Sequence, residues 1–230
     1  SFYSPDSGSI IERPNETTIL GAAKILGETS SGMRYGIINA ITDKEFGIRE
    51  YELDGVSKKE DFLIEPYTNY FVGRLEKSII NEYSTLGFLA TDLRRQNEKN
   101  KAQSFNVDWR LSLMDYKLSF QGQAASSVNI DNTGFASRFL LSYKDPKWWE
   151  LMAWGGFRDK NFDVSEMGYQ EKNNNWYSGF RGSIRRDKPN AMFLNQSLEL
   201  KLNFGGRRKD DRGDALITRK NIGLEQDNTF

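Results

Sequence analysis

Residues 103–125 alternate between apolar and polar positions. The polar residues, among them Asp108 and Arg110, occupy the even positions of the first half. The odd positions there carry the apolar residues Phe105, Val107, Trp109, Leu111 and Leu113. Because successive side chains of a strand point to opposite faces, this half predicts a strand with one apolar and one polar face.

The apolar residues change parity after Met114 and Asp115. Beyond that dipeptide, the even positions, beginning with Leu118 and Phe120, are the apolar ones. A two-residue loop predicts this change, because it places the flanking residues on the same face; a four-residue loop is the alternative. Two alternating strands of about ten residues are typical of a transmembrane β-barrel hairpin, although a hairpin of a soluble antiparallel sandwich also alternates.

The rest of the chain repeats this pattern, with residues 1–17 predicted to lead into the first strand. Further strands are predicted at residues 18–28, 33–43, 67–80, 84–95, 134–143, 149–158, 176–186 and 191–204. Another strand is predicted to begin within residues 215–225. The predicted connections alternate in length. The short ones are 29–32, 81–83, 114–115, 144–148 and 187–190, and the long ones are 44–66, 96–102, 126–133, 159–175 and 205–214. Short turns at one end and long loops at the other are typical of outer-membrane barrels, and a Greek-key sandwich has no reason to sort its loops in this way.

We therefore predict an all-β fold, an antiparallel up-and-down transmembrane β-barrel with about ten strands in this chain. Residues 18–230 would form the barrel domain or its N-terminal portion. The residues predicted to face lipid are Phe105, Val107, Trp109, Leu111, Leu113, Leu118, Phe120, Leu198, Leu200 and Leu202. The polar residues predicted to line the lumen are Asp108, Arg110, Lys117, Arg138, Glu150, Arg158, Arg181, Glu199 and Lys201.

Composition excludes several classes of function. Lys plus Arg equal Asp plus Glu at 32 each, so no charge excess indicates nucleic-acid binding. The chain has no His and no Cys, which excludes a Ser-His-Asp triad, imidazole-ligated zinc and disulfides. Asp108 and Glu150 are carboxylates of the type that glycosidases use, but charges facing a polar lumen explain them better. We expect no enzymatic activity and no cofactor.

Four stretches of the N-terminal part resemble a bacterial family of unknown function. They are FYS at 2–4, ILGAAKILGETSSGMRYGIINAIT at 19–42, EPYTNYFVGRLEK at 65–77 and STLGFLAT at 84–91. Members of that family carry a C-terminal β-barrel domain behind a module similar to family-9 carbohydrate-binding domains. The resemblance implies that this chain is the first part of such a barrel, and the start at Ser1 without a Met agrees with an excerpt of a longer product.

The expected location is the bacterial outer membrane, with the lipid bilayer as the main partner. The expected role is transport through a pore, or surface anchoring of a carbohydrate-binding module that lies outside this chain. Two alternatives remain. One is a soluble β-sandwich or barrel that binds a glycan or another ligand, and the other is the barrel part of a carbohydrate-active enzyme whose catalysis resides elsewhere.

Overall fold

The computed structural model describes residues 9–53, 55–96, 101–130, 132–145, 147–166, 170, 173–186, 195–209 and 214–229. None of these residues forms a helix that could cross a membrane. The regular elements are fourteen strands: β1 (Ser9–Glu12), β2 (Ile19–Glu28), β3 (Met33–Thr42), β4 (Glu45–Leu53), β5 (Val56–Glu65), β6 (Thr68–Ser78), β7 (Thr85–Arg95), β8 (Lys101–Leu113), β9 (Leu118–Val128), β10 (Thr133–Lys144), β11 (Trp149–Arg158), β12 (Asn175–Arg186), β13 (Asn195–Lys209) and β14 (Asp214–Thr229).

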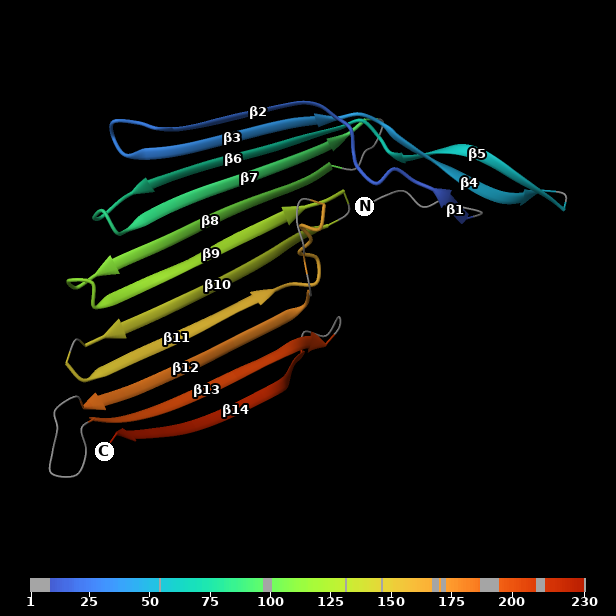
Figure 1. The fold of residues 1–230 in the computed structure, drawn as a ribbon. Helices are drawn as coiled ribbons and strands as arrows, with labels where there is room; N and C mark the ends of the chain where they lie inside the picture. Colours follow the sequence, from blue (N-terminus) through green and yellow to red (C-terminus); the bar gives the residue numbers. More distant parts are fainter. Residues whose placement is uncertain are drawn as a thin grey trace.

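Eleven of the strands form one antiparallel sheet, which follows the chain as a meander. Its order is β14-β13-β12-β11-β10-β9-β8-β7-β6-β3-β2, so neighbours in space are neighbours in sequence except at β3 and β6. Figure 1 shows this large sheet as a single curved layer. It is open, because β2 and β14 are its edges and do not pair with each other. The all-β, antiparallel prediction is confirmed, and closure into a barrel stays a prediction.

The segment between β3 and β6 belongs to a second, smaller sheet. Strands β4 and β5 form a hairpin, and β1 adds to it to give a three-stranded sheet of order β1-β4-β5. This small sheet projects from one end of the large sheet (Figure 1). Residues 44–66, predicted as a long connection, do link two strands of the large sheet, but they contain two strands that the sequence did not predict. These strands were not predicted because charged residues interrupt the alternation of apolar and polar positions. The charges pair across the hairpin, as Arg49 and Glu60 do.

The central hairpin turns over four residues rather than two. Leu113 pairs with Leu118 and Trp109 with Gly122, so each pair is displaced by two residues from the prediction, and both strands keep their predicted faces. Three residues of the turn, Met114, Asp115 and Tyr116, have positive φ. The same displacement occurs between β10 and β11. A connection at 144–148 would pair Tyr143 with Trp149, but Tyr143 pairs with Leu151. Alternation determines the face of a strand but leaves shifts of two residues undetected.

The connections are less strictly sorted by length than predicted. Strands extend into the expected loops 96–102, 126–133 and 205–214, because β8 begins at Lys101, β9 ends at Val128 and β13 ends at Lys209. The two long connections, between β3 and β6 and between β11 and β12, lie at the same end of the large sheet. Loop length therefore distinguishes the two ends only at these two places.

The large sheet has almost no hydrophobic core among the described residues. Only Ile64, Leu93 and Phe162 are buried large apolar residues, whereas many others are exposed, for example Phe105 at 50% and Leu224 at 72%. The described residues form no second sheet that covers the apolar face of this layer.

Candidate functional site

The predicted lumen residues lie together on one face of the large sheet. Paired residues share a face, and the pairs connect Asp108 through Gln123 and Arg138 to Gly156. The same reasoning places eight of the nine predicted residues on this polar face: Asp108, Arg110, Arg138, Glu150, Arg158, Arg181, Glu199 and Lys201. Lys117 is the exception, because it lies in the turn between β8 and β9. The prediction for Lys117 failed because it assumed a two-residue turn, whereas the turn covers residues 114–117.

All ten predicted lipid-facing residues lie on the opposite face. The pairs Leu111–Phe120, Phe120–Leu141 and Phe180–Leu202 connect β8 to β13 along a single row, with Ala153 between Leu141 and Phe180. From β3 to β13, the charged residues of this apolar face stand near strand ends, as Lys77, Asp92 and Arg186 do. On the edge strand β14, Lys220 also shares this face, opposite Phe204.

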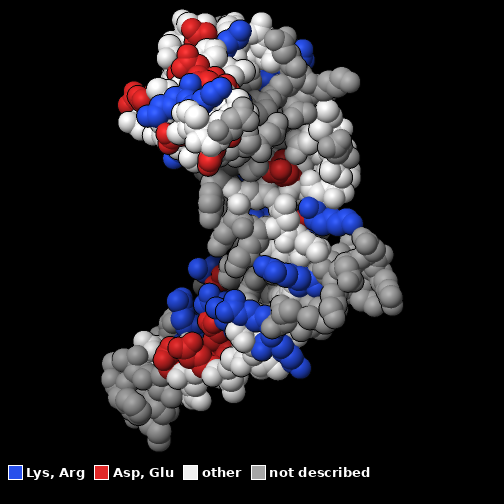
Figure 2. Space-filling model, turned by 90° about the vertical axis from the view of Figure 1, so that its right-hand side faces the viewer, with Lys and Arg blue, Asp and Glu red and all other residues white. Residues whose placement is uncertain are grey.

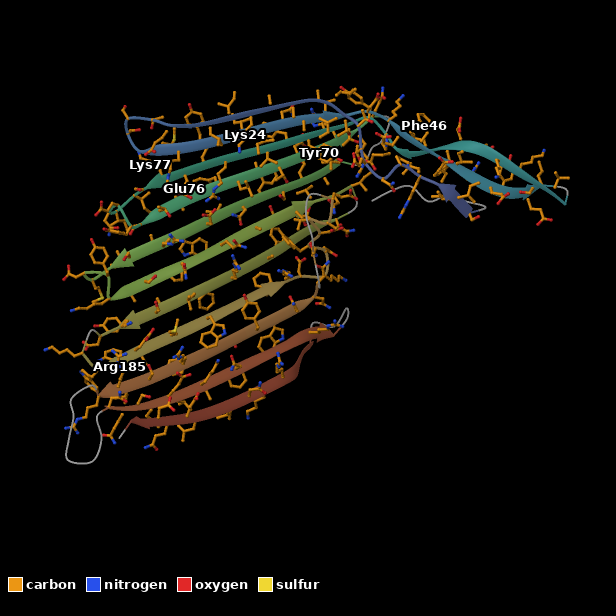
Figure 3. The ribbon with its side chains drawn as sticks, viewed as in Figure 1. Lys24, Phe46, Tyr70, Glu76, Lys77 and Arg185 are labelled. Carbon is orange, nitrogen blue, oxygen red and sulfur yellow. The ribbon has the colours of Figure 1, made fainter. Side chains whose placement is uncertain are left out.

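An ion-pair ladder on the polar face joins side chains of the three strands β3, β6 and β8. Arg34 of β3 pairs with Glu76 of β6, and Arg74 of β6 contacts both Glu76, at 2.8 Å, and Asp108 of β8. The second guanidinium nitrogen of Arg74 donates to Asp108 Oδ1 at 2.9 Å. Figure 3 labels Glu76 towards the short-turn end of the sheet. These charge-assisted hydrogen bonds hold the three strands' charged side chains together on the polar face.

Gly87 makes the link between β6 and β8 possible. It lies on the intervening strand β7, between Glu76 and Asp108 in the register. A Cβ at this position would come within 2.7 Å of both Arg74 Nη2 and Asp108 Oδ1. The absence of a side chain therefore leaves the space in which the two charged groups meet over the strand.

Other polar side chains surround a hollow of about 1160 Å³ on this face. Arg138 donates to Gln123 Oε1 at 3.4 Å, and Arg110 lies beside Asp108 along the same strand. Aromatic residues also line the hollow, and two of them cover glycines: Trp154 covers Gly179, and Tyr177 covers Gly156. Farther along the sheet, Arg181 pairs with Glu199 at 2.6 Å. The hollow therefore combines charged, amide and aromatic groups.

Asp108 and Glu150 are not brought together as a catalytic pair. Asp108 is in register with Gly156 of β11, whereas Glu150 lies near the other end of that strand, opposite Lys144. The six residues from Glu150 to Gly156 alone span roughly 20 Å, which exceeds the carboxylate separations that glycosidases use. No cluster of three or more acidic side chains among the described residues is arranged to hold a metal ion.

Aromatic side chains gather at the short-turn end of the large sheet. Tyr83 and Tyr116, from two successive turns, meet edge to face with ring centroids 4.9 Å apart. Trp149 stacks on Tyr143 at 4.7 Å and touches Trp148, whose side chain is 55% exposed. Aromatic rings at strand ends are typical of the interfacial girdles of membrane barrels.

The segment after β11, residues 159–166, folds over the polar face, which the sequence did not predict. Asp159 shapes its start: Oδ1 accepts from the backbone N–H groups of Asn161 at 3.0 Å and Phe162 at 2.7 Å, and Oδ2 accepts from Phe135 N at 2.7 Å. Phe162 is only 7% exposed, and its backbone lies directly against Gly134 of β10. Gly134 could have indicated this contact from the sequence, because a glycine within a strand often marks the close approach of another backbone.

This segment is held at two further points. The backbone N–H of Asp163 donates to Ser127 Oγ of β9 at 2.8 Å, and Glu166 pairs with Arg95 of β7 at 2.5 Å. Arg95 also contacts Glu65 at the end of β5, at 3.4 Å. The Arg95 side chain is 8% exposed. This buried guanidinium therefore links the segment 159–166, the large sheet and the small sheet.

The small sheet carries its own charged pair. Arg49 Nε donates to Glu60 Oε1 at 2.6 Å, and this bond, assisted by one from Tyr51, holds the pKa of the Glu60 carboxyl below its ordinary value despite some desolvation. The hydrogen bond to Glu60 raises the pKa of Tyr51. The side chains of Arg49 and Glu60 are 23% and 39% exposed.

No curated protein and no solved structure matches this chain. A family model does match it, over residues 3–229, and thus over nearly its whole length. The resemblance to a family of unknown function is confirmed to that extent, and the chain belongs to the family described as domain of unknown function DUF5916.

Proposed function

We propose that this chain forms a large part of the wall of an outer-membrane β-barrel, with the apolar face towards lipid and the polar face towards a water-filled lumen. The observation that carries the proposal is the segregation of the two faces across the large sheet. Its strands β6 to β13 are 10 to 15 residues long, which suits tilted strands that cross a bilayer.

The exposed apolar face supports lipid over a protein partner. Its large side chains, such as Phe88, Phe139 and Leu200, are each 39–49% exposed in the single layer. A soluble sandwich needs a second sheet about 10 Å above this face, and the described residues provide none. The girdle of Tyr83, Tyr116, Trp148 and Trp149 at one end of the layer also favours a bilayer.

The polar face supports transport over catalysis. Its charges are of both signs, and ion pairs engage Arg74, Asp108 and Glu199. Asp108 is held by Arg74, so it is poorly placed to act as a general base. Passage of a polar solute through the lumen is the role we propose, and anchoring of a further module is compatible with the same wall.

The absence of native Cys permits a direct test by site-directed spin labelling. Single cysteines replace residues 105–112 of β8 and 198–202 of β13 in the protein folded into phospholipid vesicles. The accessibility of each nitroxide to oxygen, which partitions into lipid, and to a water-soluble nickel chelate is then measured.

Oxygen accessibility is expected to peak at Val107, Trp109 and Leu111, and nickel accessibility at Asn106 and Arg110. The phase of this alternation is the readout. Labels at the apolar positions that are immobilised and reached by neither reagent would show a protein core, and would contradict the membrane proposal. Slower or faster migration of unheated protein on denaturing gels provides an independent check of a barrel.

A further inference from the structure

We propose that residues 159–166 form a fixed constriction on the inner wall, and that the Arg95–Glu166 ion pair sets its position and hence the size of solute that passes. This inference rests on the proposed function, because a constriction requires a lumen. It concerns a segment that the sequence assigned to a polar loop outside the sheet.

The path of the segment is defined by contacts with successive strands. From the end of β11 it passes Gly134 on β10 and Ser127 on β9, and it reaches Arg95 on β7. In Figure 1 this connection runs along the ends of β10 and β9 instead of away from the sheet. With strands about 4.8 Å apart, the path from β11 to β7 crosses roughly 19 Å of the wall.

All anchor points lie on the polar face. Gly134 pairs with Ser127, Ser127 with Ser104, and Ser104 with Thr91, so these four residues form one row across β10, β9, β8 and β7. Arg95 lies on the same side of β7 as Thr91, two alternations further along the strand. The segment therefore covers the lumen side of the wall.

The row beneath the segment consists of small residues. Ser127 is 1% exposed, Thr91 is 8% exposed, and Gly134 is also buried. Thr91 and Ser104 hydrogen-bond to each other at 2.7 Å, so their hydroxyl groups are satisfied. Larger side chains at these positions would occupy the space of the segment. The small residues of this row therefore leave room for the segment 159–166 on the polar face.

Arg95 anchors the segment at Glu166, the end that lies farthest from β11. Its side chain is 8% exposed and bonds to Glu166 at 2.5 Å and to Glu65 at 3.4 Å. Tyr70 of β6 lies nearby, at the end of that strand close to the small sheet (Figure 3), and is half-buried. A buried guanidinium that loses one carboxylate partner is strongly disfavoured, so the pair resists detachment of the segment.

Disulfide trapping tests the docking without any need for a pore. In the variant with Ser127→Cys and Asp163→Cys, mild oxidation is expected to form an intramolecular cross-link, because the backbone N of Asp163 lies 2.8 Å from Ser127 Oγ and the two Cα atoms are therefore close. The control pairs Ser127→Cys with Asp145→Cys, which lies at the other end of β10, and should stay reduced. Adding Glu166→Gln is expected to slow trapping roughly tenfold, which corresponds to about 1.4 kcal/mol.

Single-channel conductance in planar lipid bilayers tests the constriction. Arg95→Ala and Glu166→Gln are expected to raise conductance and to admit larger neutral polymers, because the segment swings away from the wall. Arg94→Ala is the matched control. Arg94 is the adjacent residue, but its side chain is 69% exposed and pairs with Asp92 on the other face.

The outcomes separate the two proposals. Absence of the 127–163 cross-link would overturn the docking, and a cross-link with conductance identical in all variants would overturn the constriction. Spin labels that fail to alternate between lipid and water would instead overturn the barrel, even if the cross-link forms. Cross-linking together with a conductance increase in the Arg95 and Glu166 variants, and not in the Arg94 variant, supports the constriction.

Discussion

The two sheets of this protein use charge in opposite ways. In the small sheet both faces carry charges: Arg49 faces Glu60 on one side of the β4–β5 hairpin, and Glu50 faces Lys59 on the other. Figure 2 shows positive and negative groups intermixed over this projecting part. In the large sheet, charges in the middle of strands β3 to β13 lie on one face only.

Under the proposed function, this difference corresponds to a different environment for each sheet. A strand with charges on both faces is adapted to water on both sides. A strand whose apolar face is uncharged over its whole middle, and is not covered by a second sheet of the described residues, suits the lipid-facing wall that we propose. The comparison can therefore be tested by placing the same charge on chosen faces.

Two adjacent alanines of β9 provide the largest expected contrast. Ala124 lies on the apolar face and Ala125 on the polar face, where it pairs with Asn106. Ala124→Arg is expected to cost about 2–4 kcal/mol of folding free energy in lipid, whereas Ala125→Arg should cost little. Equilibrium folding titrations in vesicles measure both.

The reverse order would exclude a lipid-facing surface. Ala124 is the more exposed of the two residues in the isolated layer, and Ala125 is half-buried. If the apolar face met water, Ala124→Arg would be the harmless substitution. The rank of the two variants, rather than the size of either effect, is therefore decisive.

Gly87→Ala tests the polar face, with an expected cost of about 1 kcal/mol, a typical value for loss of a partly exposed ion pair. The added methyl group would meet Arg74 and Asp108 and separate them. Gly21→Ala on β2 is the control, because a Cβ there meets nothing within 4 Å. Equal free energies of unfolding for the two variants would show that the ladder contributes nothing to stability.

Phe46→Arg tests the small sheet. Phe46 is 55% exposed and is labelled on the projecting part in Figure 3. If this sheet lies in water, the substitution should change stability by no more than about 0.5 kcal/mol, as surface changes usually do. A loss as large as that of Ala124→Arg in the same folding titration would place the small sheet in lipid and remove the contrast between the sheets.

The smallest expected effect is a pH dependence of the β4–β5 hairpin. Arg49 lowers the pKa of Glu60 in the folded state, so the contribution of this pair is fully present above the unfolded pKa, about 4.3. It is lost as the pH falls through the lower folded pKa. An NMR titration of the Glu60 carboxyl should show the lowered pKa, and Arg49→Gln should return it towards the ordinary value. An unchanged pKa in that variant would show that the ion pair is absent in solution.

The sequence by itself determined the strands of the large sheet and their faces. Alternation at residues such as Val107 and Asp108 depends only on the two-residue period of a strand, which no tertiary contact alters. All ten predicted apolar positions accordingly share one face of the sheet, and eight of the nine predicted polar positions share the other. The family of unknown function could also be recognised from local stretches.

Only the tertiary structure decided which residues meet. A shift of two residues in register preserves every face, so the pairs of Trp109 and Tyr143 could not be read from alternation. The small sheet was hidden because strands with charges on both faces do not alternate. The Arg95–Glu166 pair joins residues 71 positions apart, and its formation depends on the space above Gly134 and Ser127, which exists only once β9 and β10 are side by side.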